Sequence, residues 1–164
     1  MKHIKNYLDI LKNGINNLDL SKLSKIENII FKKINDKKKI FVCGNGGSAS
    51  IANHFLCDFN KGIKLSSKKI VKPKVISLAN SLELITAISN DLNYEKIFSF
   101  QLENFANNDD LLITFSCSGS SKNIVNAVKL AKTLGLNIIC ISGFGKKNKT
   151  ADINLNLNCK NYGV

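Results

Sequence analysis

The most informative stretch of this chain is VCGNGGSASIANHF, residues 42–55. An apolar run ends there in glycines and a helix-like pattern follows, so the stretch predicts a strand, a tight loop and a helix start. Glycines let the backbone approach a ligand without Cβ contacts, and the amides of a helix start carry the positive end of the helix dipole. The loop therefore binds an anionic or hydroxyl-rich ligand, or it is only a structural turn.

A second loop of the same kind is SCSGSS, residues 116–121, between an apolar run at 111–115 and a helical pattern at 124–131. Its hydroxyl groups lie beside the amides of a helix start, which suits a phosphate monoester; the alternative is a serine-rich helix cap. A nucleotide-binding loop GxxxxGK[ST] is absent, and so is GxGxxG with a downstream acidic residue. Nucleotides are therefore not the favoured ligand.

Apolar runs and helical patterns alternate along the rest of the chain. Strands are predicted at 40–43, 74–78, 111–115, 137–141 and 153–157, and helices at 82–88, 94–105 and 124–131. Ser81 is expected to cap one of these helices and Gly135 to end another. This alternation indicates an α/β fold with a doubly wound parallel sheet flanked by helices. Ligands bind at the carboxyl ends of such strands, so the two loops should form one site.

Two amphipathic segments at 4–18 and 23–34 precede the first strand and predict an N-terminal helical hairpin. We expect a single domain over residues 1–164, with the hairpin in 1–36 and the α/β core in 37–164. The apolar stripes must be buried on the core or on another subunit, so a homo-oligomer is predicted. Packing on the same subunit is at least as good an explanation for the second helix.

The composition limits the possible function classes. The 164 residues are 44% hydrophobic, enough for one buried core, and show neither a long apolar run nor a signal-peptide pattern, so a cytoplasmic protein without membrane contact is expected. The five scattered cysteines predict reduced thiols. The net charge of +12 comes with lysine as the only basic side chain besides histidine. Without arginine, nucleic acid is an improbable partner, and the charge is interpreted mainly as a solvated surface.

His54 and Asp58 are four residues apart on a predicted helix and therefore share one face. Such a pair ligates a metal, acts as an acid/base pair, or is merely a surface pair. Zinc needs three or four ligands, and the only other histidine is His3.

Four motifs, in this order, resemble the sugar isomerase (SIS) domain and, within it, the phosphoheptose isomerases. They are CGNGGS at 43–48, His54-Phe55, Asn90-Asp91 with Tyr94 and Phe98 downstream, and SCSGSS at 116–121, which is close to the family's STSGNS. Members of the family interconvert sedoheptulose 7-phosphate and glycero-manno-heptose 7-phosphate, for lipopolysaccharide or capsule synthesis, by proton transfer through an enediol. The resemblance implies a flavodoxin-like three-layer sandwich, a cytoplasmic homotetramer and one zinc ion per subunit.

The resemblance also implies a role for each matching residue. Phosphate would be held by Ser116, Ser118 and Ser121, and sugar hydroxyls by Asn45 and Ser48. Asp91 would contact the substrate, and His54 would be a zinc ligand. The remaining substrate contacts would come from the neighbouring motif residues Gly46, Gly47, Asn90 and Cys117.

Two departures from the family pattern bear on activity. The family's catalytic glutamate falls at Asp58, which is one methylene shorter and is the candidate for both base and metal ligand. The family's last helix, with a glutamine and a histidine that complete the zinc site, would begin near Asn161, where this sequence runs to Val164. The resemblance thus implies an incomplete zinc site and weak turnover by these residues. The alternative is a non-catalytic SIS binding module, such as a protein that associates with the replication initiator, or a sugar-phosphate sensor.

Overall fold

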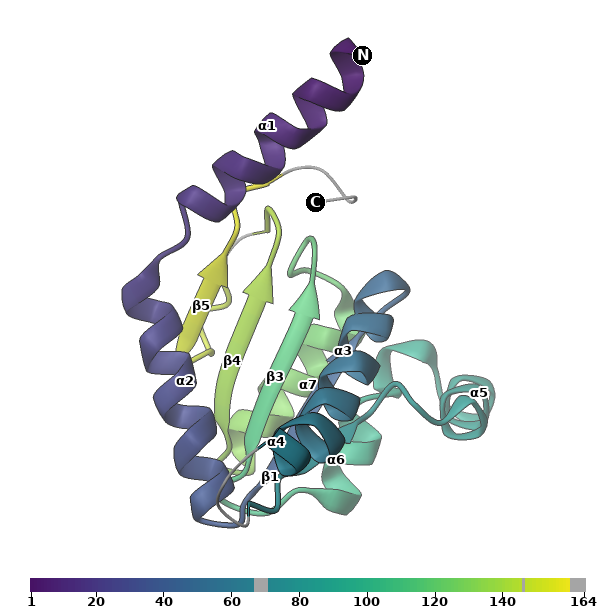
Figure 1. Cartoon of the computed structure of the whole chain (residues 1–164). Coiled ribbons are helices and arrows are strands. Elements are labelled where there is room, and N and C mark those ends of the chain that lie inside the picture. Colours follow the sequence, from purple (N-terminus) through teal and green to yellow (C-terminus); the bar gives the residue numbers. More distant parts are fainter. Residues whose placement is uncertain (67–70, 146, 160–164) are drawn as a thin grey trace.

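The computed structural model describes residues 1–66, 71–145 and 147–159. Figure 1 shows a parallel sheet with helices on both faces. Its five strands lie in the order β2-β1-β3-β4-β5, and each neighbouring pair is parallel. The strands are β1 (Lys39–Gly44), β2 (Lys74–Ser77), β3 (Leu111–Ser116), β4 (Asn137–Ser142) and β5 (Ile153–Asn156). The predicted α/β fold with a doubly wound parallel sheet is confirmed.

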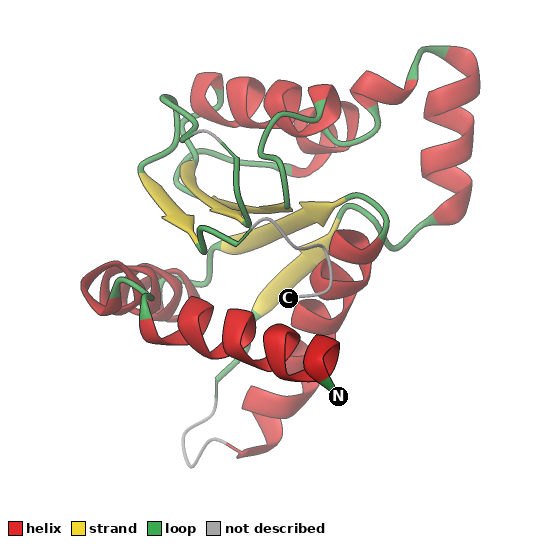
Figure 2. Ribbon diagram, turned by 90° about the horizontal axis from the view of Figure 1, so that it is seen from above, coloured by secondary structure: helices red, strands yellow, loops and turns green. Residues whose placement is uncertain are grey.

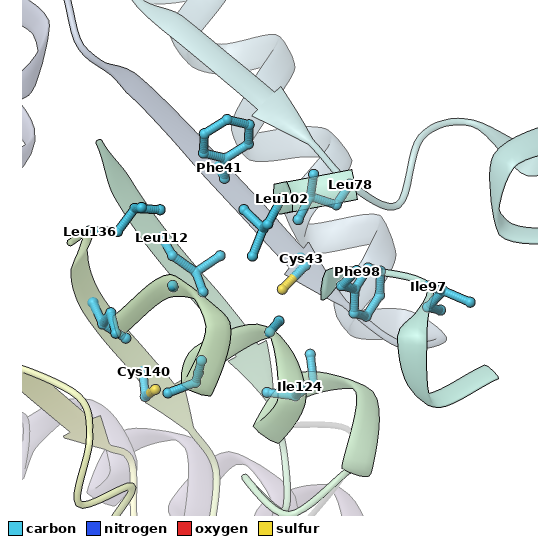
Figure 3. Packing of buried hydrophobic residues seen from close by; sticks show 14 of the residues in the cluster. Phe41, Cys43, Leu78, Ile97, Phe98, Leu102, Leu112, Ile124, Leu136 and Cys140 are labelled. Carbon is cyan, nitrogen blue, oxygen red and sulfur yellow. The ribbon is translucent and has the colours of Figure 1, made fainter. Parts of the chain in front are cut away.

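Successive residues of the central strands β1, β3 and β4 enter two separate cores, one on each face of the sheet. In β1, Phe41 and Cys43 pack with α6 (Ser99–Phe105) and α7 (Lys122–Thr133), as Figure 3 shows. Ile40 and Val42 point to the other face, which α2 (Leu20–Asn35) and α3 (Gly47–Cys57) cover. All four strand residues are fully buried. Burial on both faces explains the unbroken apolar runs in the strands.

The strand order places a switch point between β1 and β3. From β1 the chain crosses through α3 to β2 on one side, whereas β3 lies on the other side of β1 and continues through α7 to β4. Parallel crossovers are right-handed, so α3 and α7 lie on opposite faces of the sheet (Figure 2). The loops that follow β1 and β3 therefore diverge and leave a crevice between them.

The segment between β2 and β3 departs from the prediction in one place. Ser81 caps α5 (Leu82–Asp91) by accepting from Leu84 N, as predicted, but the single helix expected at 94–105 is wrong. The chain instead forms the 3₁₀ turn η2 (Tyr94–Lys96) and then α6. Ile97 and Phe98, between them, are both buried. Lys96 N donates to Asn93 O and Ile97 N donates to Tyr94 O, which are 3₁₀ bonds across three residues, so α-helical hydrogen bonding begins only with α6.

The N-terminal helices are present, but they do not form the predicted hairpin. In Figure 1, α1 (Lys2–Asn16) points away from the sheet, while α2 runs along it. The apolar stripe of α2 faces the sheet, where Ile26 is buried, so this stripe packs on the sheet and not on α1. α1 has no buried residue and instead lies beside Leu157 and Cys159 near the chain's end. The position near Asn161, where the family's last helix would begin, lies outside the described residues.

All five cysteines are free thiols, as predicted. Burial raises the pKa of Cys43 and of Cys140, both of which lie in strands, so neither is reactive at neutral pH. Among the described residues, no helix has the length and apolar character needed to cross a membrane.

Candidate functional site

A cleft of about 630 Å³ opens at the carboxyl ends of β1 and β3, at the switch point of the sheet. Its lining consists of Asn45, Gly46, Gly47, Ser48, Ile51, Ser116, Cys117, Ser118 and Ser121. Eight of these nine residues belong to the two predicted loop motifs, which the fold thus brings together. Ile51 was not predicted; it lies one helical turn after Ser48 and supplies an apolar wall.

The first loop turns directly from β1 into α3. Ser48 N donates to Asn45 O at 3.0 Å, which closes the turn. Gly44 ends β1 where the backbone of Ser48 passes too close for a side chain, so the start of α3 lies tightly against the strand. Gly46 and Gly47, at this helix start, line the cleft.

The serine loop holds its shape with its own side chains. Ser116 Oγ accepts from Gly119 N at 3.1 Å, and Ser118 Oγ accepts from Ser120 N at 3.3 Å. Ser121 is the N-cap residue of α7, but its side chain makes no capping hydrogen bond. Its hydroxyl lines the cleft, where it can donate to a ligand.

A turn after β4 supports the serine loop from behind. The amides of Gly143 and Phe144 both donate to Cys117 O, at 3.1 and 3.0 Å. At Gly145 there is no room for a Cβ atom, because the backbone oxygen of Ser118 occupies that position. This role of Gly145 is not predictable from the sequence, since the contact joins segments that are distant along the chain.

Among the described residues, no charged side chain lines the cleft. Two helix starts, those of α3 and α7, meet there instead. Their amides and dipoles favour an anion without a lysine in direct contact, and the serine hydroxyls add donors around it. The geometry thus suits a ligand that carries a phosphate group and several hydroxyls.

His54 and Asp58 lie on α3 and at its end, outside the cleft lining. His54 Nε2 lies 3.3 Å from Asp58 Oδ2, and the two side chains are 76% and 59% exposed. Within the part of the chain that the structure describes, no three His, Cys, Asp or Glu side chains gather into a metal-binding group. These two residues therefore do not make a zinc site by themselves.

Asn90 and Asp91 end α5 and are likewise absent from the cleft lining. Asn90 Nδ2 donates to Asp91 Oδ1 at 2.9 Å on the surface. Figures 1 and 2 show α5 standing out from the body of the fold. A substrate contact by either residue stays a prediction.

The SIS domain family matches residues 2–143 of this chain. The phosphoheptose isomerase of Helicobacter pylori strain P12 is 36% identical over 149 residues, which are 90% of this chain and 76% of that protein. The phosphoheptose isomerase of Aliarcobacter butzleri is 38% identical over 135 residues, or 81% and 70%. This chain belongs to the phosphoheptose isomerase family of SIS-domain proteins. The family recognised from four motifs is confirmed, and it is a family of enzymes.

Solved structures of the family share the fold of this SIS-domain chain. A phosphoheptose isomerase from Francisella tularensis superposes with a TM-score of 0.86 at 25% identity, covering 99% of this chain and 85% of that one. The phosphoheptose isomerase from Neisseria gonorrhoeae gives a TM-score of 0.83 at 26% identity, with the same coverage. The sheet order and the crevice between the two loops are therefore those of the phosphoheptose isomerase fold.

Proposed function

We propose that this protein is a sugar-phosphate isomerase that binds sedoheptulose 7-phosphate and converts it to glycero-manno-heptose 7-phosphate. The observation that carries the proposal is the cleft at the switch point, where the glycine loop and the serine loop meet. Its volume lies within the usual range for small-molecule sites. The names of the relatives support the class of reaction.

In this proposal the phosphate lies against residues 116–121 and the start of α7, where hydroxyls and helix amides converge. The sugar extends toward the glycine loop, where Asn45 and Ser48 donate to its oxygens. Gly46 and Gly47 let the sugar lie against the backbone, and Ile51 packs on its carbon atoms. Asn90 and Asp91 are proposed as further contacts to the sugar.

The reaction moves a proton between C1 and C2 through an enediol, while a second proton moves between the two oxygens. It needs a base at carbon and donors at the oxygens. We propose Asp58 as the base because it occupies the position of the family's glutamate. Asp58 does not line the cleft. If it is the base, Asp58→Asn should lower turnover by about 10²- to 10⁴-fold, because an amide cannot accept the proton, while the affinity for the sugar phosphate changes little. Equal loss of affinity and turnover would instead give Asp58 a binding role.

Zinc is proposed as the metal, with His54 and Asp58 as two of its ligands. The other ligands would have to come from elsewhere, because the described residues offer no third. Metal analysis of purified protein and of the His54→Ala variant tests this. A zinc content that is low in both proteins would contradict the proposal.

The assembly and location follow from the family resemblance. We propose a cytoplasmic homotetramer that serves heptose synthesis for lipopolysaccharide or capsule. The exposed apolar side chains of α1 support self-association. A sugar-phosphate sensor remains the alternative function, because ligand binding needs only the two loops.

The proposal is tested by calorimetry with sedoheptulose 7-phosphate and ATP, and by turnover of the sugar phosphate. We expect binding of the sugar phosphate and not of ATP. Ser121→Ala should weaken binding about tenfold or more, since one hydrogen bond to a charged group is lost. Ser50→Ala is the control, because Ser50 is exposed on α3 outside the cleft. Binding without turnover would favour the sensor, and tight ATP binding would overturn the proposal.

A further inference from the structure

Asn123 lies on the first turn of α7, just beyond the serine loop. Its side-chain amide pairs with that of Asn45 in the glycine loop. Asn45 Nδ2 donates to Asn123 Oδ1 at 2.9 Å, and Asn123 Nδ2 donates to Asn45 Oδ1 at 2.8 Å. Asn123 is only 2% exposed, so water competes little for these bonds. The pair joins the loop after β1 to the helix after β3.

A backbone amide decides the orientation of both side chains. The N–H of Ile124 can only donate, and it donates to Asn123 Oδ1 at 2.9 Å. Asn123 must therefore direct its oxygen toward Ile124 and its nitrogen toward Asn45 Oδ1. A rotated Asn45 would place nitrogen against nitrogen, so its orientation is determined as well.

Tyr94, on η2, completes the set, because its hydroxyl donates to Asn45 Oδ1 at 3.0 Å. Asn45 Oδ1 thus accepts from both Asn123 and Tyr94, which uses its two lone pairs. The amide nitrogen of Asn45 carries two protons and gives one to Asn123. The other N–H is what Asn45 can offer to a ligand in the cleft that it lines.

We propose that Asn123 and Tyr94 are positioning residues. They occupy the side-chain oxygen of Asn45, so that Asn45 can only donate a hydrogen bond to an oxygen of the sugar, either a hydroxyl or the carbonyl. The inference rests on the proposed sugar-phosphate site and deepens it. It divides the cleft into two parts: the serine loop binds the phosphate, and Asn45 binds the sugar. Sugar affinity should therefore depend on two residues that are not in the cleft lining.

η2 is also held on α7 by contacts that do not pass through Asn45. Lys122 Nζ lies 2.7 Å from Glu95 Oε1, and Asn126 Nδ2 donates to Glu95 O at 3.2 Å. Removing the Tyr94 hydroxyl alone should therefore leave η2 in place. Asn126 offers a matched control, since it is the same residue type on the same helix and its amide binds η2 rather than Asn45.

The test measures two ligands by calorimetry, sedoheptulose 7-phosphate and inorganic phosphate. Asn123→Asp keeps the acceptor for Ile124 but turns an oxygen toward Asn45 Oδ1, so the sugar phosphate should bind about tenfold more weakly. Tyr94→Phe, at a half-exposed position, should cost about threefold. Inorganic phosphate should bind Tyr94→Phe as it binds the wild type, and in Asn123→Asp, whose added charge lies on the first turn of α7, it should lose less affinity than the sugar phosphate. Asn126→Ala loses the bond to Glu95 O without adding a charge and leaves the Lys122–Glu95 contact to hold η2, so it should change neither affinity.

The two ligands separate positioning from a general structural effect. If Asn123→Asp and Tyr94→Phe each lose as much affinity for inorganic phosphate as for the sugar phosphate, the inference is overturned. It is also overturned if neither variant changes its affinity for either ligand. If Asn123→Asp does not fold, Tyr94→Phe decides by the same criterion. A wild type that binds phosphate but no sugar phosphate would refute the proposed function itself.

A measurement without ligand tests the network separately. In ¹⁵N-labelled protein, one δ-amide proton of Asn45 should exchange slowly with water because it is bonded to Asn123, and the other should exchange fast. Tyr94→Phe should shift the Asn45 side-chain signals and leave those of Asn126 in place. Two fast-exchanging Asn45 protons in the wild type would show that the pair does not form, which would overturn the inference whatever the protein binds.

Discussion

Gly44, the last residue of β1, has no room for a side chain. A Cβ atom there would lie 2.5 Å from the backbone oxygen of Ser48 and 2.6 Å from its carbonyl carbon. Backbone atoms cannot move aside as the end of a flexible side chain can. The close contact between strand and helix start therefore determines where α3 begins beside the cleft.

Gly44→Ala is expected to lower the free energy of unfolding by about 1–3 kcal/mol, because the added methyl group overpacks the turn. It should also weaken sugar-phosphate binding, since α3 must shift. Gly47→Ala is the control for stability: a Cβ atom there meets nothing within 4 Å, and the residue is helical. Urea denaturation of both variants measures the difference, and equal stability of the two would contradict the argument.

Lys33 is a buried cation on α2 that reaches the loop before β3. Its Nζ donates to Asp109 O at 2.8 Å and forms an ion pair with the Asp109 carboxylate. The lysine side chain is 2% exposed and that of Asp109 is 45% exposed. The hydrogen bond from Lys33 is the main cause that lowers the pKa of Asp109. Removing the Asp109 carboxylate would leave the buried ammonium group of Lys33 without its counter-ion. Removing Lys33 would leave the Asp109 carboxylate in contact with water.

At neutral pH, Asp109→Asn should therefore lower the free energy of unfolding by about 1–3 kcal/mol, and Lys33→Met should lower it by less, under about 1.5 kcal/mol. Asparagine tolerates the positive φ of 67° at this position. Because the pKa of Asp109 is lower in the folded state, its contribution is complete above about pH 4 and is lost as the pH falls through the folded-state pKa. Urea denaturation at several pH values should show that the gap in the free energy of unfolding between wild type and Asp109→Asn becomes smaller at acid pH. A gap that stays constant with pH would contradict this account.

At the scale of secondary structure, α3 does not end as a regular α-helix. It continues into the π-helical segment η1 (Asp58–Ile63) and then α4 (Lys64–Ser66). Within η1, Asn60 binds both backbone groups of Val75: Nδ2 donates to Val75 O at 2.9 Å, and Oδ1 accepts from Val75 N at 3.1 Å. β2 is an edge strand, so these bonds satisfy groups that no neighbouring strand pairs.

Asn60→Ala is expected to destabilise the fold by about 2 kcal/mol, since two backbone groups of the buried Val75 lose their partner. Hydrogen exchange at the Val75 amide should become faster, and thermal unfolding should begin at a lower temperature. Lys61→Ala, at the exposed next position, should change neither measurement. Slow exchange at Val75 in Asn60→Ala would show that the side chain does not protect the edge.

At the scale of the whole molecule, α1 is the element that the single chain leaves uncovered. Ile4 is 65% exposed, Leu8 44% and Ile15 58%, and all three belong to the apolar stripe recognised from the sequence. α2, in contrast, is committed to the sheet through Ile26 and Lys33. α1 thus leaves more of its large apolar side chains exposed than α2, on which Leu20 and Phe31 are exposed, and it is the first candidate for a subunit interface.

Leu8→Lys is expected to reduce the molar mass measured by light scattering from that of the proposed tetramer, because a charge enters the apolar stripe. Asn6→Lys adds the same charge on the opposite, polar side of α1 and should leave the mass unchanged. A wild-type chain that is monomeric would refute the assembly proposal. A tetramer that withstands Leu8→Lys would place the interface elsewhere.

The sequence by itself determined the succession of strands and helices along the chain, the parallel sheet and the two ligand-facing loops. Apolar runs, helical spacing, the Ser81 cap and the Gly135 helix end, whose φ is 75°, are local signals that need no knowledge of distant residues. Two of the four family motifs, CGNGGS and SCSGSS, lie in these same loops. Eight cleft residues could therefore be predicted, because the carboxyl ends of parallel strands meet at one edge.

Only the tertiary structure decided which distant residues support those loops and where the outer helices point. The bonds of Asn45 with Asn123 and Tyr94 and of Asn60 with Val75 join segments whose proximity depends on strand order. The same holds for the contact of Gly145 with Ser118. The direction of α1 depends on α2 having used its apolar face on the sheet. No periodicity encodes such contacts, because each exists only once the five strands are assembled in their order.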